Sequence, residues 1–210
     1  MVKGLFAAAV LFVAALSARA DTLVGYWDLN ENLNRNAGTS GSLAVEVIGL
    51  GIQYVGWGTG SDKNLVEGYP VGQSLQFTNL ATVAEVGHIT LSNLNFTNLV
   101  NPVITFAAKS NPGFELSDTF TIDYWNGSQW VSSKLDKPTT SYEVITHPFR
   151  AGELDGVANA SIRISFSTVA AVVDTMNIDN IQVNAVPEPG TLALAGIGMV
   201  GAFVLWRRRR

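Results

Sequence analysis

Strict alternation of apolar and polar side chains is the feature that most constrains how this chain of 210 residues folds. Two segments alternate without a break, residues 119–125 (TFTIDYW) and residues 161–166 (SIRISF). Successive side chains of a strand point to opposite faces, so each segment predicts a strand with one buried and one solvated face. Such strands are typical of antiparallel sheets that pack face to face.

The rest of the region between residues 21 and 185 also favours strands. Short β-branched and aromatic runs recur between Gly, Asn, Pro and Ser clusters, and no run of ten residues keeps a helical period without a breaker. We expect one all-β domain over residues 21–185, a two-sheet antiparallel β-sandwich of the jelly-roll type. The expected strands are residues 23–29, 43–48, 74–79, 88–91, 102–108, 119–125, 129–134, 141–146, 160–167 and 176–184.

Turn signals separate these strands. Asn126-Gly127 is the strongest, since both residues accept the positive φ of a type I′ turn, and it predicts a tight hairpin between Trp125 and Trp130. The glycine-rich segments 49–51 and 56–60 are also interpreted as turns, because no helix or suitably placed lysine follows them to make a phosphate loop.

The first twenty residues have the pattern of a signal peptide. Lys3 supplies a positive start, residues 5–16 are apolar, and Ala18 and Ala20 form an A-x-A cleavage site for signal peptidase. Twelve apolar residues are too few to span a bilayer. We therefore expect residues 1–20 to be removed and the mature chain to begin at Asp21.

The last 25 residues, 186–210, combine three pieces without a spacer. Pro187, Glu188 and Pro189 come first, an uncharged apolar stretch follows at residues 191–206, and Arg207, Arg208, Arg209 and Arg210 end the chain. The apolar stretch predicts a transmembrane helix of about 24 Å, a little short of the ~30 Å hydrocarbon layer. Terminal arginines favour a cytoplasmic C-terminus.

This order of pieces resembles the PEP-CTERM sorting signal of Gram-negative bacteria. The resemblance implies recognition by an exosortase, a membrane-embedded transpeptidase, and cleavage near Pro187-Glu188-Pro189. The protein would then cross the inner membrane, remain for a time as a single-pass membrane intermediate, and reach the cell surface or the extracellular polymer. Removal of the helix and a permanent single-span anchor both remain open.

Charge and cysteine content exclude several function classes. Between residues 21 and 186 there are seven basic and sixteen acidic residues, a net charge of −9, which opposes binding to nucleic acid or anionic lipid. The absence of cysteine excludes disulfides, thiolate nucleophiles and cysteine-based zinc sites.

Catalytic groups are sparse. The chain has two histidines and no G-x-S-x-G or H-E-x-x-H motif, so we expect no enzyme activity. A glycosidase requires only two suitably spaced carboxylates, and Glu115, Asp118, Asp123 and Glu143 are the candidates in or near strands. We interpret these four as solvated acids.

Aromatic side chains offer a sharper hypothesis, because flat rings on a rigid sheet or loop can stack on sugars. The candidates are Tyr54, Trp57, Trp125 and Trp130. Alternation directs Trp125 away from the core, although it would also fit a contact with Trp130 across the hairpin. Trp57 lies between two glycines, which favours a loop tip or a plug over the end of the core.

The ectodomain resembles the jelly-roll domains that often precede PEP-CTERM tails and are related to carbohydrate-binding modules. The similar residues are 103–108, 120–130, 162–166 and 177–181. This resemblance implies a structural Ca²⁺ between the first and last strands, with Asp28 and Asp179 as ligands and Asn30, Glu31 and Asn177 nearby. The alternative for Asp179-Asn180 is a β-bulge or a backbone cap.

These observations predict an exported, surface-sorted, non-catalytic protein with a structural or adhesive role in the cell envelope or extracellular matrix. The alternatives are a carbohydrate-binding module protein and, third, a glycan-active hydrolase. The expected partners are signal peptidase, an exosortase, the membrane at least transiently and an extracellular polysaccharide, but no nucleic acid.

Overall fold

The structure is a computed structural model that describes residues 21–30, 32–48, 52–79, 85–111, 119–168 and 174–188. The signal peptide with Ala18 and Ala20 lies outside the described residues, as do the tail from Pro189 to Arg210 and the helix expected there. Within the described ranges, no helix is long and apolar enough to cross a membrane.

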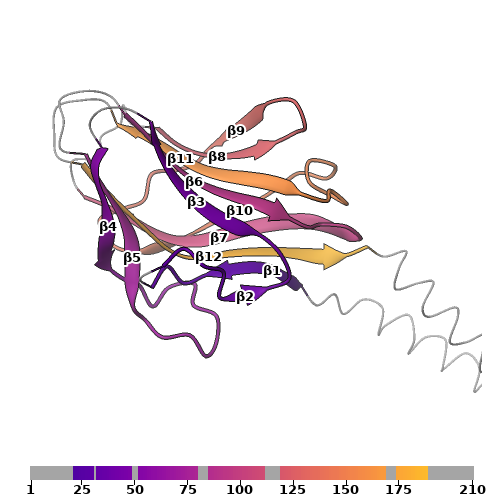
Figure 1. The fold of residues 1–210 in the computed structure, drawn as a ribbon, viewed down its shortest axis with the longest axis horizontal. Helices are drawn as coiled ribbons and strands as arrows, with labels where there is room; N and C mark the ends of the chain where they lie inside the picture. The colour runs from indigo at the N-terminus through magenta and orange to yellow at the C-terminus, as the bar shows by residue number, and fades with distance from the viewer. Residues whose placement is uncertain are drawn as a thin grey trace, which may run out of the picture.

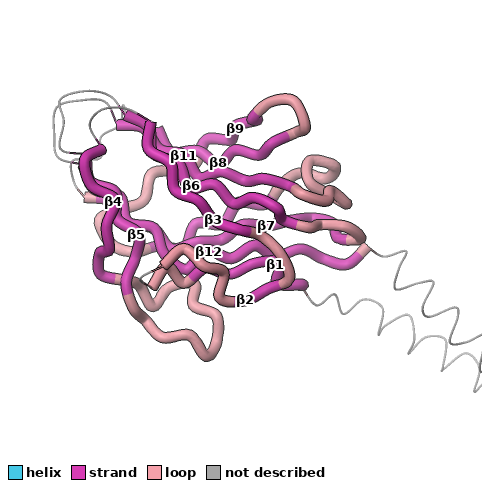
Figure 2. Tube along the Cα trace, in the orientation of Figure 1, coloured by secondary structure: helices cyan, strands magenta, loops and turns pink. Residues whose placement is uncertain are grey.

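The described residues form twelve strands and no helix, and in Figure 2 these residues are drawn only as strands and loops. The strands are β1 (Thr22–Trp27), β2 (Ala37–Gly38), β3 (Ser42–Ile48), β4 (Ile52–Thr59), β5 (Gln73–Asn79), β6 (Glu85–Leu94), β7 (Leu99–Ser110), β8 (Thr119–Trp125), β9 (Trp130–Lys134), β10 (Glu143–Pro148), β11 (Ala160–Thr168) and β12 (Asp174–Pro187). All ten expected strands are present, and the all-β prediction is confirmed.

The strands make two antiparallel sheets that face each other (Figure 1). The seven-stranded sheet has the order β10-β7-β12-β1-β2, with β5 also paired to β12 and β4 paired to β5. The five-stranded sheet has the order β3-β6-β11-β8-β9. This is the predicted two-sheet jelly-roll sandwich.

Strand β12 organises the seven-stranded sheet. Its first half pairs with β5 and its second half with β1, while β7 runs along its other edge. The register against β7 shifts between Asp179 and Gln182, and Asn180 has a positive φ of 50° there. This is the bulge considered as an alternative for Asp179-Asn180, and it lies where β12 changes partner.

The two alternating segments supply the core as predicted. Phe120 and Ile122 of β8 and Ile162 and Ile164 of β11 are almost fully buried between the sheets. Each such side chain contributes about 1.5–3 kcal/mol when it leaves water. Aromatic rings join the layers, as in the edge-on contact of Phe106 with Phe120, whose centroids are 6.0 Å apart.

The interpretation of residues 56–60 as a turn is wrong, because residues up to Thr59 belong to strand β4. The glycines there serve close packing: a Cβ on Gly58 would collide with the Asn177 amide, and a Cβ on Gly60 with the backbone of Gly72. A glycine required by a neighbouring chain looks the same in the sequence as a glycine required by a turn.

The β8–β9 hairpin is confirmed, but its turn is not the expected type I′ turn. Trp125 pairs with Trp130, which leaves a four-residue loop at 126–129. Gly127 has a positive φ of 96°, whereas Asn126 is not among the residues with positive φ. Instead, Asn126 Oδ1 accepts hydrogen bonds from the backbone amides of Ser128 and Gln129, at 3.0 and 2.9 Å.

Candidate functional site

The outer face of the five-stranded sheet carries the polar half of the alternating segments. Register places Asp123 of β8 between Arg163 of β11 and Ser132 of β9, and it places Trp125 opposite Trp130. Cross-strand neighbours on one face lie close enough for their side chains to interact. The fold therefore gathers a carboxylate, a guanidinium and two indoles on one surface.

Asp123 is the anchor of this face. Its Oδ2 accepts hydrogen bonds from Arg163 Nε at 2.8 Å and Ser165 Oγ at 2.6 Å, and its Oδ1 accepts one from Thr121 Oγ1 at 3.1 Å. Burial alone would raise the pKa of Asp123, but hydrogen bonds from Ser132, Ser165 and Arg163 and the charge of Arg163 lower it below its usual value. Asp123 is 1% exposed and forms an ion pair with Arg163, so its interpretation as a solvated acid is wrong.

Arg163 connects Asp123 to the tryptophans. Its guanidinium carbon lies 4.4 Å from the Trp130 ring centroid, a cation–π contact. The Trp130 and Trp125 rings meet edge to face, with centroids 5.7 Å apart, so the contact considered as an alternative for Trp125 is confirmed. Trp125 nevertheless remains 39% exposed, one of the most exposed large apolar side chains described.

His88 extends the network on strand β6. Its Nδ1 lies 2.9 Å from Ser165 Oγ, and because that hydroxyl donates to Asp123, its oxygen accepts from His88. Burial and the charge of Arg163 lower the pKa of His88. A hydrolytic triad needs the histidine between serine and carboxylate, whereas here the serine stands between them. The network thus stiffens a surface and does not activate a nucleophile.

A pocket of about 600 Å³ adjoins Trp125. It is lined by hairpin residues 124–127, by residues 151–153 and 157–159 of the loop before β11, and by Ala160 at the start of β11. Burial and the neighbouring Glu153 raise the pKa of the Tyr124 hydroxyl. The exposed ring of Trp125 therefore borders a hollow that also contains amide and carboxylate groups.

The structure separates Trp57 from the two hairpin tryptophans. Trp57 lies on β4 of the seven-stranded sheet, where it is half-buried against the core and pairs with Leu75. Its prediction as a loop-tip residue is wrong, because the loop begins after β4 ends. Tyr54 is in the same strand, and its side chain lies outside the described residues.

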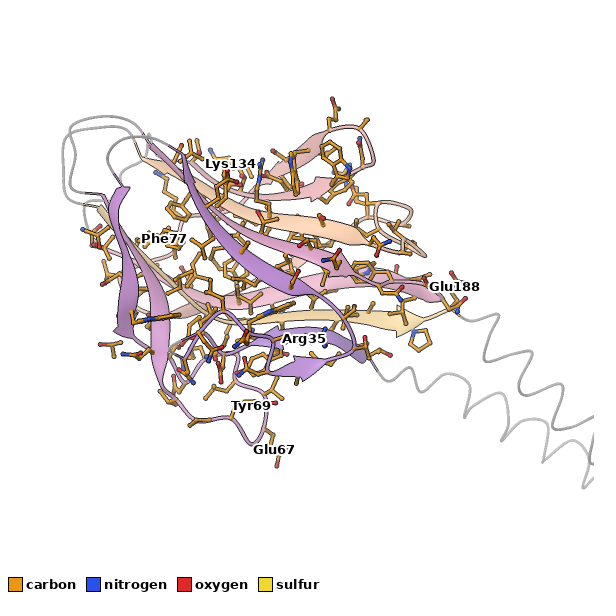
Figure 3. The ribbon with its side chains drawn as sticks, viewed as in Figure 1. Arg35, Glu67, Tyr69, Phe77, Lys134 and Glu188 are labelled. Atoms are coloured by element: carbon orange, nitrogen blue, oxygen red, sulfur yellow. The ribbon has the colours of Figure 1, made fainter. Side chains whose placement is uncertain are left out.

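The loop between β4 and β5, residues 60–72, covers part of the outer face of the seven-stranded sheet, and Figure 3 labels Glu67 and Tyr69 on it. Tyr69 packs edge-on against Tyr26, with ring centroids 4.9 Å apart. The Tyr69 hydroxyl donates to the carbonyl of Asn36 at 2.8 Å. This loop covers the part of the second face that contains Tyr26 and the β12 bulge.

Residues of the β12 bulge form hydrogen bonds with the loop between β4 and β5. Asp179 Oδ2 accepts from the Ser61 amide at 2.7 Å, and the Asn180 side-chain amide donates to the carbonyls of Ser61 and Lys63, both at 2.9 Å. The Tyr26 hydroxyl donates to Asn180 Oδ1 at 3.0 Å. Asp179 and Asn180 are both 1% exposed, so they act as buried anchors for the loop.

Asp28 and Asp179, the residues expected to bind Ca²⁺, lie on this covered side of the molecule. Asp28 is 5% exposed, and its Oδ1 accepts from the Asn30 amide at 3.1 Å. Burial raises the pKa of Asp179 to about 7; hydrogen bonds from Ser61 and Asn180 oppose this rise, and the charge of Asp28 adds to it. Neither carboxylate takes part in the ion pairs found among the described residues. A bound cation would compensate the negative charges of these two buried carboxylates.

The acidic set is small for Ca²⁺, which takes six to eight oxygen ligands. No group of three or more His, Cys, Asp or Glu suited to a metal occurs in the part of the chain that is described. Both carboxylate oxygens of Asp179 already accept hydrogen bonds, from the backbone amides of Ser61 and Asn180. Two carboxylates therefore fit a Ca²⁺ only with carbonyl or water oxygens as the remaining ligands.

Sequence reasoning had assigned Arg163, Ser165 and Asp123 to solvated strand faces but had not joined them. Their link depends on β8 and β11 being neighbours, although 34 residues separate the end of β8 from the start of β11. Two other candidate carboxylates, Glu115 and Asp118, lie outside the described residues. Glu143 accepts a hydrogen bond from the Thr139 amide at 2.7 Å and stabilises the start of β10.

Comparison with known proteins identifies the tail. Residues 185–210 match the family model described as the PEP-CTERM protein-sorting motif. The predicted sorting signal is thereby confirmed, and the chain is an exported protein with a C-terminal membrane-anchoring sorting signal. No curated protein matches the chain in sequence.

Several solved structures are similar to the sandwich. The CBM22-1 xylan-binding domain of Paenibacillus barcinonensis Xyn10C is 16% identical over 81% of this chain and 99% of that chain, with a TM-score of 0.48. The family 11 carbohydrate-binding module of the Clostridium thermocellum cellulase Lic26A-Cel5E is 15% identical over 80% and 95%, with a TM-score of 0.43. The glycoside hydrolase domain of Streptococcus pneumoniae Endo-D is 12% identical over 76% and 27%, with a TM-score of 0.49.

Proposed function

We propose that the mature domain is a non-catalytic protein of the cell surface or extracellular matrix that binds polysaccharide through the outer face of its five-stranded sheet. The observation that carries this proposal is the tryptophan pair beside an anchored arginine. Trp125 is exposed, Trp130 supports it, and Arg163 holds Trp130 while bound to the buried Asp123. Retention of the protein in a polysaccharide matrix would be its adhesive role.

Rigidity favours this function. Stacking a sugar on an aromatic ring gains most when the ring is held in place before binding, because no side-chain freedom is then lost. Trp125 is held by its contact with Trp130 and by the strand pairing beneath both rings. The adjacent pocket offers space for the next sugar unit and polar groups to orient it.

Charge favours a neutral polysaccharide over an acidic one. The positive charge of Arg163 on this face is paired with Asp123, and the region from residue 21 to residue 186 has a net charge of −9. A polyanionic chain would therefore meet net repulsion at low salt, and Arg163 is already paired and would not compensate it.

The test is binding of the purified domain to soluble neutral and acidic polysaccharides by affinity electrophoresis and calorimetry. We expect Trp125→Ala to weaken binding at least tenfold, about 1.4 kcal/mol, with unchanged circular dichroism and melting temperature. The matched control is Val144→Ala, since Val144 is 46% exposed on the opposite sheet. Equal binding by the two variants, or no saturable binding to any neutral glycan, would contradict the proposal.

A structural Ca²⁺ held by Asp28 and Asp179 is a second part of this proposal. Both carboxylates are buried, and neither has an ion-pair partner among the described residues, which supports this proposal. We expect added Ca²⁺ to raise the melting temperature of the wild-type domain by several degrees, through preferential binding to the folded state. The Asp28→Asn variant should lose this effect, and Asp62→Asn, on the exposed loop, should keep it. A melting temperature insensitive to Ca²⁺ and chelator would exclude the ion.

A further inference from the structure

The sorting motif begins inside the folded sheet. Strand β12 ends at Pro187, where Val186 pairs with Val100 and Pro187 pairs with Leu99 of β7. On the opposite edge of β12, Ala185 pairs with Thr22 of β1. The strand had been expected to stop at residue 184, so its last residues extend into the sorting segment.

Hydrogen bonding continues past the proline. Pro187 has no amide hydrogen, but the next amide, that of Glu188, donates to the Asn98 carbonyl at 2.9 Å. Asn98, which precedes β7, has a positive φ of 61°, and its carbonyl accepts this hydrogen bond from Glu188. Glu188 is half-buried, and Figure 3 shows it where β12 ends beside β7.

The loop before β11 forms hydrogen bonds with the start of β7, next to the end of β12. The Gly156 amide donates to the Leu99 carbonyl at 2.9 Å, and the Asn101 amide donates to Asp155 Oδ1 at 2.8 Å. The loop before β11 therefore fastens the segment of β7 that holds the motif. Two of the three residues of the Pro-Glu-Pro sequence are thus occupied by intramolecular contacts.

An enzyme that cleaves a peptide chain binds it in an extended form through the backbone. Cleavage breaks one peptide bond: the acyl carbon passes to an incoming nucleophile, either water or an amine, and the tail leaves as a free amine. The backbone of residues 186–188 cannot serve β7 and an enzyme at the same time. The end of a strand separates from its neighbour more readily than the middle of the strand does.

We propose that the pairing of residues 186–188 with β7 is a latch, and that the end of β12 must separate from β7 before the sorting enzyme can act. Folding of the sandwich then holds back processing, and opening of one strand end permits it. The PEP-CTERM motif implies the enzyme; the latch is a property of this chain's own sheet.

The test introduces a reversible cross-link at the latch. The chain contains no cysteine, so the V100C/V186C double variant places two thiols at paired positions without competing partners. The full-length variant is produced in the native host under oxidising or reducing conditions, and the tail is followed by intact mass. We expect the oxidised variant to keep its tail at least tenfold longer than the reduced one.

The matched control is V103C/N184C, which joins the same two strands just before the motif. Its oxidised form should be processed at the rate of its reduced form, because the cross-link leaves residues 186–188 free. Equal processing of oxidised and reduced V100C/V186C would overturn the latch, and so would a wild-type chain that keeps its tail. Glycan binding by Trp125 is measured separately and is unaffected by either outcome.

Discussion

Each outer face of the sandwich buries an aspartate almost completely, yet the pKa values of these two aspartates shift in opposite directions. Asp123 and Asp179 are both 1% exposed. The pKa of Asp123 is lowered below its usual value, whereas burial raises the pKa of Asp179 to about 7. Asp123 has Arg163 as an ion-pair partner, while Asp179 has backbone amides and the nearby charge of Asp28.

This difference separates a surface built to face solvent from a surface built to hold a loop. On the five-stranded sheet, side chains from neighbouring strands neutralise Asp123, so the face needs no cover and leaves Trp125 exposed. On the seven-stranded sheet, Asp179 and Asn180 use their hydrogen bonds to fasten residues 61–64. Burial there raises the pKa of Asp179, so a proton can neutralise its charge.

The largest effect should come from removing the partner of Asp123. We expect Arg163→Met to lower the free energy of unfolding by about 3 kcal/mol at pH 7, because it leaves a buried carboxylate unpaired. The lowered pKa of Asp123 means that its stabilisation is present above the unfolded pKa and is lost as the pH falls. The deficit of the variant should therefore shrink towards pH 3 in urea unfolding experiments.

Lys134→Met is the matched control, because Lys134 lies on the same sheet but is exposed (Figure 3). It should change the free energy of unfolding by less than about 0.5 kcal/mol. An Arg163→Met variant as stable as wild type at pH 7 would contradict the role of Arg163 in stabilising the charge of Asp123, and with it the difference between the two faces.

A smaller effect of opposite sign is expected at Asp179. Its folded pKa, about 7, lies above the usual 3.8, so its contribution is full below pH 4 and is lost as the pH rises through 7. Without added Ca²⁺, the stability of wild type relative to Asp179→Asn should fall by about 2 kcal/mol between pH 5 and pH 8. His88 and His147, whose pKa values are lowered, are present in both proteins and cancel in this difference.

The Asp179 measurement is unfolding by urea at several pH values, with Asp62→Asn as the control on the covering loop. The Asp62 side chain is 73% exposed, so its substitution should leave the pH dependence unchanged. A flat difference between wild type and Asp179→Asn would mean that Asp179 titrates normally despite its burial.

The smallest effect should come from the hairpin that presents Trp125. Asn126 Oδ1 accepts three hydrogen bonds within the turn, two from the backbone amides of Ser128 and Gln129 and one from the Ser128 hydroxyl. We expect Asn126→Ala to cost about 1 kcal/mol, since these groups are exposed and water replaces the lost acceptor. Ser128→Ala, which removes one of the three bonds, should cost less, and equal costs would contradict this role.

Much of the fold could be predicted because the alternation of side chains directly reports which face is buried. Residues 119–125 and 161–166 met this expectation, and Asp123, Arg163 and Trp125 were correctly assigned to outward faces. Strand β4 was missed because glycines such as Gly58, which the packing of Asn177 requires, are also the usual residues of turns.

The sequence by itself determined the all-β class, the positions of the expected strands and the sorting motif at the C-terminus, since each depends on residues that are neighbours along the chain. The tertiary structure decided which strands pair, and therefore that Asp123 meets Arg163, that Trp57 lies apart from Trp125, and that residues 186–188 pair with β7. Strand pairing joins residues far apart in the sequence, and local patterns carry no record of the partner.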